Sequence, residues 1–138
     1  MIDLNTEFGK RVLRRLQAAP TIWLTTVSRD GTPQPRPVWF LWTGEAFLIF
    51  SRPEGAKLRH ISRNPRVALH LDSDGQGGDI IVILGEAVIE PQGPTPQEMN
   101  AYIHKYESGM AHLGLSPKQF QARYATSIRI TPTTLRGH

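Results

Sequence analysis

Apolar residues recur at four-residue spacing near the start of the chain, at Phe8, Val12 and Leu16. An α-helix turns every 3.6 residues, so this spacing predicts an amphipathic helix over residues 6–18. Basic residues fill much of the remainder, and we interpret them as the solvated face of that helix. They are Lys10, Arg11, Arg14 and Arg15.

The pattern then changes to short apolar runs separated by turn residues. Residues 21–28 are rich in β-branched side chains, and Asp30-Gly31 follows as a hairpin signal. The next run covers residues 33–42 and becomes strongly apolar from Val38 to Trp42. A turn at 43–45 leads into a further strand at 46–50. These runs predict a three-stranded antiparallel meander.

Prolines mark one flank of the second predicted strand, at Pro33, Pro35 and Pro37. Alternate N–H groups of a strand point to the same side, so this flank lacks three donors in a row. It cannot form a normal ladder. We therefore expect either a solvent edge or a neighbour that is not a strand.

The segment 50–57 predicts the end of a strand, a tight turn and the start of a short helix. Ser51 and Glu54 have the spacing of a capping box, and Pro53 is tolerated in a first helical turn. The helix should end near Asn64, because Pro65 disfavours helical geometry in the residue before it.

The rest of the chain continues with strands and ends with helices. Strands are predicted at 67–71 and 80–89, with Gly85 as a bulge and a glycine-rich hairpin loop at 72–79. Capping boxes at Thr95 and Ser116 predict two helices, and residues 127–130 predict a closing strand. Short strands joined by tight turns favour a closed antiparallel barrel, in one domain spanning residues 1–138.

Composition limits the chemistry. The chain has no cysteine, which excludes disulfides, thiolate zinc sites and a cysteine nucleophile. Sixteen Lys and Arg against twelve Asp and Glu favour an anionic partner, such as nucleic acid or a phosphorylated cofactor. No apolar run approaches the roughly 18 residues of a membrane span, and residues 1–20 lack the apolar centre of a signal peptide. We expect a soluble, cytoplasmic protein that does not bind membranes.

Common catalytic motifs are missing from the sequence. It has no dinucleotide-binding glycine motif, P-loop, zinc-protease helix or serine-hydrolase elbow. The five histidines show no metal-ligand spacing, so no metal site is predicted, and no catalytic residue can be assigned.

One constellation stands out from this background. Ser51, Arg52 and Lys57 gather where the short helix should begin, and free amides at a helix start favour a phosphate. The proline-marked strand earlier in the chain carries Arg36 and Trp39. Together they predict a cradle for an elongated, anionic and partly aromatic ligand, of which a nucleotide-like cofactor is one example.

At these residues the sequence resembles the pyridoxamine 5′-phosphate oxidase-like split β-barrel superfamily. More specifically it resembles the actinobacterial branch of reductases that use the deazaflavin coenzyme F420. Nearly the whole chain takes part, and the order and spacing of the fragments carry the resemblance. The fragments are 21–26, 30–31, 37–42, 51–53, 56–57, 64–67, 78–80 and 128–132.

The resemblance implies a mainly β fold, a six- to seven-stranded antiparallel split barrel of the FMN-binding type. It implies a homodimer with two cofactor sites at the subunit interface and a small-molecule substrate. Ser51 and Lys57 would hold the cofactor phosphate with Arg52 beside them, and the backbone from Arg36 through Pro37 and Val38 to Trp39 would follow the ring system. Asp79 and Ile80 would come from the other subunit.

Two departures from the flavin-mononucleotide oxidases bear on the cofactor. Those enzymes carry a lysine and an arginine where this chain has Leu41 and Ala56, so two phosphate partners are missing. Their C-terminal Arg-x-His substrate motif also has no clear counterpart in residues 133–138. The departures favour F420 over FMN and argue against pyridoxamine phosphate oxidation.

The predicted function is therefore an F420-dependent oxidoreductase that reduces an unsaturated organic substrate by hydride transfer. One alternative is an FMN-dependent oxidoreductase of the same fold. Another is a non-catalytic split-barrel carrier of a cofactor or haem. Nucleic-acid binding is not favoured, because the basic residues accompany no recognised base-reading module.

Overall fold

The computed structural model describes residues 2–138, which form seven strands and four helices. The strands are β1 (Ile22–Val27), β2 (Pro33–Val38), β3 (Leu41–Trp42), β4 (Phe47–Ser51), β5 (Arg66–His70), β6 (Ile81–Glu90) and β7 (Thr126–Gly137). The helices are α1 (Glu7–Ala18), α2 (Ala56–Arg63), α3 (Pro96–His112) and α4 (Pro117–Arg123). All pairings are antiparallel, in the order β2-β1-β5-β6-β7-β4-β3.

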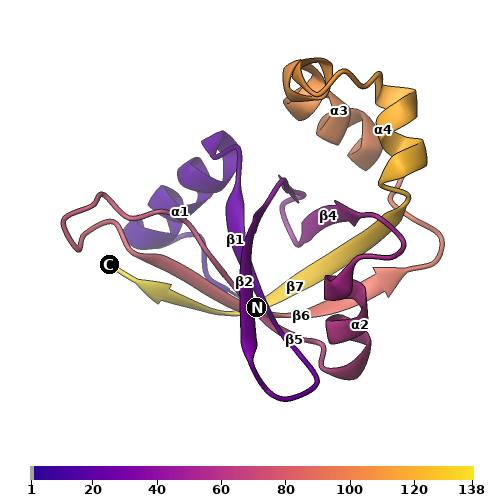
Figure 1. The fold of residues 1–138 in the computed structure, drawn as a ribbon. Coiled ribbons are helices and arrows are strands. Elements are labelled where there is room, and N and C mark those ends of the chain that lie inside the picture. The colour runs from indigo at the N-terminus through magenta and orange to yellow at the C-terminus, as the bar shows by residue number, and fades with distance from the viewer. Residues whose placement is uncertain (1) are drawn as a thin grey trace.

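This curled sheet is the split barrel that the resemblance implied (Figure 1). It is a half-barrel with β2 and β3 at its two edges, so the expectation of a closed barrel was wrong. Alternate side chains of β1, β5 and β6 are buried on one face, as the two-residue period of a strand requires. Leu58 and Ile61 of α2 pack into the same core.

Helix α1 confirms the predicted amphipathic helix. Thr6 caps it, and Val12 and Leu16 are fully buried. Its basic face is only partly a solvated surface, because Arg11 and Arg15 both form ion pairs with Asp79. The helix is therefore tied to the loop between β5 and β6.

The predicted meander is wrong, because its second strand is two strands. β2 ends at Val38 and β3 begins at Leu41, and the two lie at opposite edges of the sheet. Phe40 is fully buried at the corner between them. Its N–H donates to the hydroxyl of Tyr106, and its carbonyl accepts from Lys105 Nζ, both at 2.8 Å. Helix α3 thus holds a bend that no local pattern signals.

Lys105 at this corner gives a testable pH dependence. Burial lowers its pKa to about 8, against ~10.4 in an unfolded chain. Between these pH values the unfolded chain binds more protons than the folded protein, so the unfolding free energy rises with pH. This gain in stability from Lys105 is lost as pH falls through 8. We expect Lys105→Met to flatten the rise of the unfolding free energy over this alkaline range in urea titrations. A rise of unchanged size would contradict the assignment.

The proline-marked flank is a sheet edge, as one of the two expectations required. β2 pairs only with β1, where Pro35 lies opposite Thr25 and Pro37 opposite Trp23. Prolines at alternate positions leave backbone acceptors and no donors along the free side. We call this free side of residues 33–37 the proline edge.

Most other predicted boundaries hold. The register between β6 and β7 shifts at Leu84/Gly85, which confirms the bulge. Capping boxes at Thr95 and Ser116 open α3 and α4. α2 ends with Asn64 as its C-cap. β7 runs to Gly137, well beyond the predicted residue 130. No helix within residues 2–138 has the length and apolar character needed to cross a membrane.

Candidate functional site

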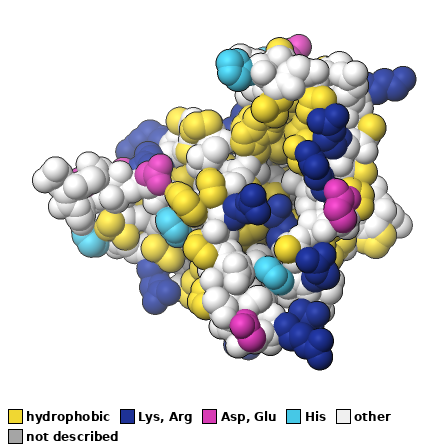
Figure 2. Space-filling model, in the orientation of Figure 1, with side chains coloured by type: hydrophobic (Ala, Val, Ile, Leu, Met, Phe, Trp, Pro, Cys, Tyr) yellow, Lys and Arg dark blue, Asp and Glu magenta, His cyan; other side chains and the backbone are white. Residues whose placement is uncertain are grey.

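A pocket of about 740 Å³ lies between β2, the start of α2 and the α3–α4 hairpin. Figure 2 shows basic side chains gathered along a hollow on this face, with hydrophobic side chains above them. The pocket brings together seven of the nine predicted cofactor-binding residues. They are Arg36, Pro37, Val38, Trp39, Ser51, Arg52 and Lys57.

Asp79 and Ile80 lie outside this pocket. The Asp79 carboxylate pairs with Arg11 and Arg15, and the backbone of Ile80 exchanges hydrogen bonds with that of His138. Within its own chain, neither residue contributes to the site. Their expected role in a partner's site stays a prediction.

The start of α2 differs from the predicted capping box. Gly55 is the N-cap, no side chain caps the helix, and Ser51 is the last residue of β4. Gly55 N–H donates to the Arg52 carbonyl at 3.0 Å, and the Ser51 hydroxyl donates to the same carbonyl at 2.9 Å. The tight turn at 52–55 thus delays the helix, which places Lys57 in its first turn.

Gly55 leaves the space that the Ser51 hydroxyl occupies. A Cβ on Gly55 would lie 2.6 Å from Ser51 Oγ and 3.2 Å from the Arg52 carbonyl oxygen. We expect Gly55→Ala to reduce the unfolding free energy by about 1–3 kcal/mol through this overlap. Urea unfolding should show partial recovery when Ser51→Ala is added, because the overlapping hydroxyl is then gone. Equal losses in both backgrounds would show that the overlap is not the cause.

Positive charge concentrates on one side of the pocket. Burial lowers the pKa of Lys57, and the nearby charge of Arg36 lowers it further. Within residues 2–138, neither cation has a carboxylate partner, and no Asp or Glu lines the pocket. Two neighbouring cations without a counter-ion favour an anionic ligand.

The residues present fit a phosphate. Ser51 is buried, and both Ser51 and Lys57 line the pocket. The first-turn amides and dipole of α2 add positive potential at the same place. The proline edge alongside offers acceptors to N–H groups of a ligand.

An aromatic wall completes the pocket, and apart from Trp39 it was missed by the sequence analysis. It consists of Trp39, Phe50, Tyr102, Phe120 and Tyr124. Tyr102 lies in a helix that was predicted only from its capping box, and Phe120 and Tyr124 carried no signal of their own. Only the folding of the α3–α4 hairpin over β4 brings them to the ligand side.

His60 was also missed, although it lies one turn after Lys57 on α2. Its Nδ1 lies 2.8 Å from Thr26 Oγ1, and both residues line the pocket. The i and i+3 spacing of Lys57 and His60 could have found it. Among residues 2–138, no three His, Asp or Glu side chains come together as a metal site.

The family model described as pyridoxamine 5′-phosphate oxidase matches residues 8–138. A solved F420 reductase is 27% identical, with a TM-score of 0.68 over 89% of this chain and 94% of that one. A comparison with curated proteins found no significant match.

Two further solved structures share the fold at lower identity. The haem storage protein HutZ from Vibrio cholerae is 15% identical, with a TM-score of 0.71 over 96% of this chain and 95% of that one. General Stress Protein 26 from Bacillus anthracis is 22% identical, with a TM-score of 0.71 over 91% and 89%.

Proposed function

Because the chain belongs to the pyridoxamine 5′-phosphate oxidase family, we propose that it is an oxidoreductase that uses coenzyme F420 to reduce an unsaturated organic molecule. The observation that carries this proposal is the pocket with Arg36 and Lys57 beside the buried Ser51 hydroxyl and no acidic residue in its lining. The similarity to an F420 reductase at 27% identity supports the choice of cofactor.

The deazaflavin, when bound, supplies a hydride from its ring carbon. The protein supplies binding, orientation and exclusion of water. Ser51 and Lys57 hold the phosphate, with Arg52 beside them, and the backbone of residues 36–39 positions the ring. The aromatic wall keeps water from the reacting atoms.

The two departures from the flavin oxidases gain a physical meaning in this pocket. Ala56 lines it with a methyl group, so the arginine charge of those enzymes is missing from the phosphate end. Leu41 lies outside the lining and packs against the buried residues of α3 and α4. In this pocket, therefore, only the change at Ala56 lowers the positive charge available to a flavin phosphate, and it supports F420 over FMN.

Titration of the purified protein with F420 and with FMN tests the proposal directly. We expect saturable F420 binding and much weaker FMN binding. Tight FMN binding without F420 binding would overturn the choice of cofactor. Oxidation of reduced F420 with a panel of unsaturated acceptors then separates an enzyme from a carrier, because a carrier binds the cofactor without turnover.

We also propose that the protein is a homodimer whose partner subunit brings Asp79 and Ile80 to the site. Within its own chain, ion pairs with Arg11 and Arg15 hold Asp79 in place. Sedimentation equilibrium should give twice the chain mass. A monomer that binds F420 with full affinity would exclude a contribution from the partner.

A further inference from the structure

Among residues 2–138, His60 is the one histidine that lines the pocket, and the proposed function gives it no role. It is half-buried, and its Nδ1 lies 2.8 Å from Oγ1 of Thr26, which is 3% exposed. The Nε2 atom of His60 has no hydrogen-bond partner within residues 2–138. One ring nitrogen is therefore fixed against β1, and the other is available to a ligand.

The Thr26 hydroxyl suits either charge state of this imidazole. A hydroxyl both donates and accepts hydrogen bonds. It can donate to a bare Nδ1 of the neutral ring, and it can accept from the Nδ1–H of the protonated ring. Protonation of His60 therefore costs no hydrogen bond to the protein. A backbone carbonyl in the same place would have accepted only from an Nδ1–H.

His60 lies one helical turn after Lys57 on α2, and both line the pocket. Residues three apart are neighbours on a helix surface, and helical side chains lean toward the N-terminal end. The imidazole therefore lies on the same side of α2 as the Lys57 ammonium. A phosphate bound at Lys57 adds negative charge next to this ring, and a nearby opposite charge favours a protonated imidazole.

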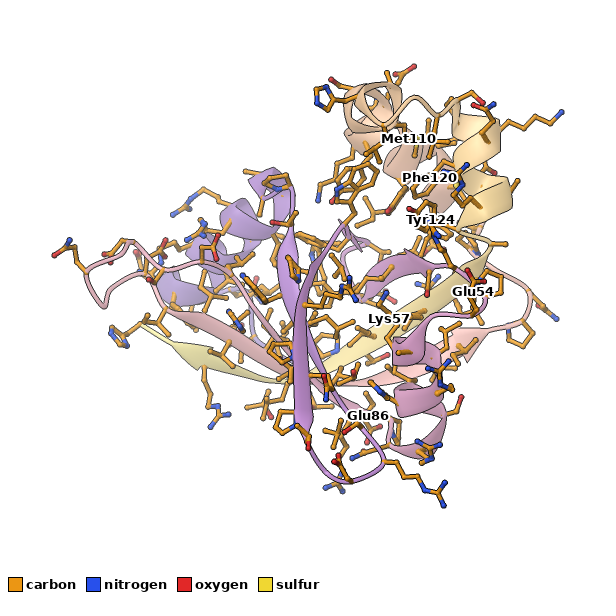
Figure 3. All side chains as sticks on the ribbon, in the orientation of Figure 1. Glu54, Lys57, Glu86, Met110, Phe120 and Tyr124 are labelled. Atoms are coloured by element: carbon orange, nitrogen blue, oxygen red, sulfur yellow. The ribbon has the colours of Figure 1, made fainter. Side chains whose placement is uncertain are left out.

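No acidic side chain faces His60 within residues 2–138. α2 packs against β1, which has no charged residue, and against β6. On β6, Glu86 is exposed and alternates with the buried Ala87, so it points to the other face of the sheet. Figure 3 shows Glu86 near the end of α2, away from Lys57 at its start. The charged residues of the pocket lining are all cations: Arg36, Arg52 and Lys57. The other cations of α2 are exposed, namely Arg59 and Arg63.

We propose that His60 is a further cation of the anion site, and that its ring takes up a proton from solvent when a phosphate binds beside Lys57. In the occupied site, Nδ1–H donates to Thr26 and Nε2–H donates to a phosphate oxygen. This inference rests on the proposed function, because it assigns another binding residue to the same pocket. A neutral ring spares the empty pocket one more positive charge beside Arg36 and Lys57, and like charges in proximity are unfavourable.

Calorimetry measures this proton uptake directly. F420 is titrated at about pH 7, within the range where histidine titrates, in buffers of low and high ionisation enthalpy. The dependence of the binding heat on the buffer gives the number of protons taken up. Wild-type protein should take up more than His60→Asn, which keeps a hydrogen-bonding group for Thr26 but cannot ionise. Proton exchange by the ligand itself is common to both proteins, so their difference reports on His60.

The affinity should depend on the same proton. We expect wild-type affinity for F420 to fall about tenfold from roughly pH 6 to pH 8, since one charge-assisted contact is lost. His60→Asn should bind with the weaker affinity at both pH values. His104→Asn is the matched control and should behave as wild type does, because His104 is exposed on α3 and lies outside the pocket lining.

Two further measurements guard against a folding defect. Thermal melting shows whether both variants are folded. NMR of the histidine rings in wild-type protein needs no substitution, and on addition of F420 one of the five rings should move to the protonated position. If none moves, His60 takes up no proton and the proposal is wrong.

Inorganic pyrophosphate separates this proposal from the choice of cofactor. If F420 does not bind but pyrophosphate binds with a proton uptake that His60→Asn loses, the role of His60 stands and only the cofactor falls. If F420 binds with equal proton uptake in both proteins, His60 is not a cation of the site although the cofactor stands. Failure of both probes to bind would overturn both proposals.

Discussion

Replacing Lys57 with alanine is expected to weaken F420 binding at least tenfold while the protein remains folded. A charge-assisted hydrogen bond contributes about 1.5–3 kcal/mol, and each ~1.4 kcal/mol is a factor of ten in affinity. Lys57 lines the pocket beside Ser51, and no carboxylate within residues 2–138 neutralises it. Isothermal titration of the variant measures the loss. The exposed Lys118 on α4 provides the control, since Lys118→Ala should bind as wild type does.

The same substitution should leave stability intact or raise it. Burial and the charge of Arg36 lower the pKa of Lys57, so keeping it charged costs folding free energy at neutral pH. F420 affinity should also fall as alkaline pH deprotonates Lys57, and this fall should vanish in Lys57→Ala. Unchanged affinity in the variant would remove Lys57 from the site.

Local signals predicted much of the fold. The four-residue spacing of α1 and the capping boxes of α3 and α4 act within a few residues, so the sequence alone specifies them. The glycine at Gly85 is itself a local signal for the bulge, although the carbonyl that leaves no room for a side chain there, that of Thr131 at 2.7 Å, lies on β7. Prolines at alternate positions identified an edge strand for the same reason.

The path of the chain between β2 and β3 could not be predicted in this way. Residues 38–42 form an unbroken apolar run, which reads as one strand. The break depends on Lys105 and Tyr106, more than sixty residues later, which bind the backbone of Phe40. The spacing of apolar residues carries no information about such distant partners. The prediction of a three-stranded meander was therefore wrong.

The cationic half of the site was accessible to sequence analysis, and the aromatic half was not. Ser51, Arg52 and Lys57 lie within seven residues, so one turn and one helix start place them together. Even there the capping prediction was wrong, because the turn at 52–55 satisfies its own backbone. Phe120 and Tyr124 reach the pocket only through packing of the α3–α4 hairpin, which helical spacing does not specify.

We expect Tyr106→Phe to lower the unfolding free energy substantially, although it removes only one hydroxyl group. The Tyr106 hydroxyl accepts from Phe40 N–H at 2.8 Å and lies 2.7 Å from the Pro20 carbonyl, to which it donates. Without this hydroxyl, the backbone N–H of the fully buried Phe40 loses its hydrogen-bond partner. Such a loss costs about 1–3 kcal/mol. Urea unfolding should show this loss. Tyr124→Phe is the control, because the Tyr124 hydroxyl has no hydrogen bond within residues 2–138, and its change should stay within about 0.5 kcal/mol.

Tyr106 holds the bend at Phe40, and this bend also positions the pocket. We therefore expect Tyr106→Phe to affect cofactor binding as well as stability. The ring of Trp39 stacks on that of Tyr106 with centroids 4.5 Å apart, and Trp39 ends the backbone segment proposed to follow the cofactor ring. Phenylalanine keeps the stacking surface but frees the Phe40 N–H, so residues 38–40 can shift. We therefore expect Tyr106→Phe to weaken F420 binding. Lost stability with unchanged affinity would show that the corner supports the fold without positioning the site.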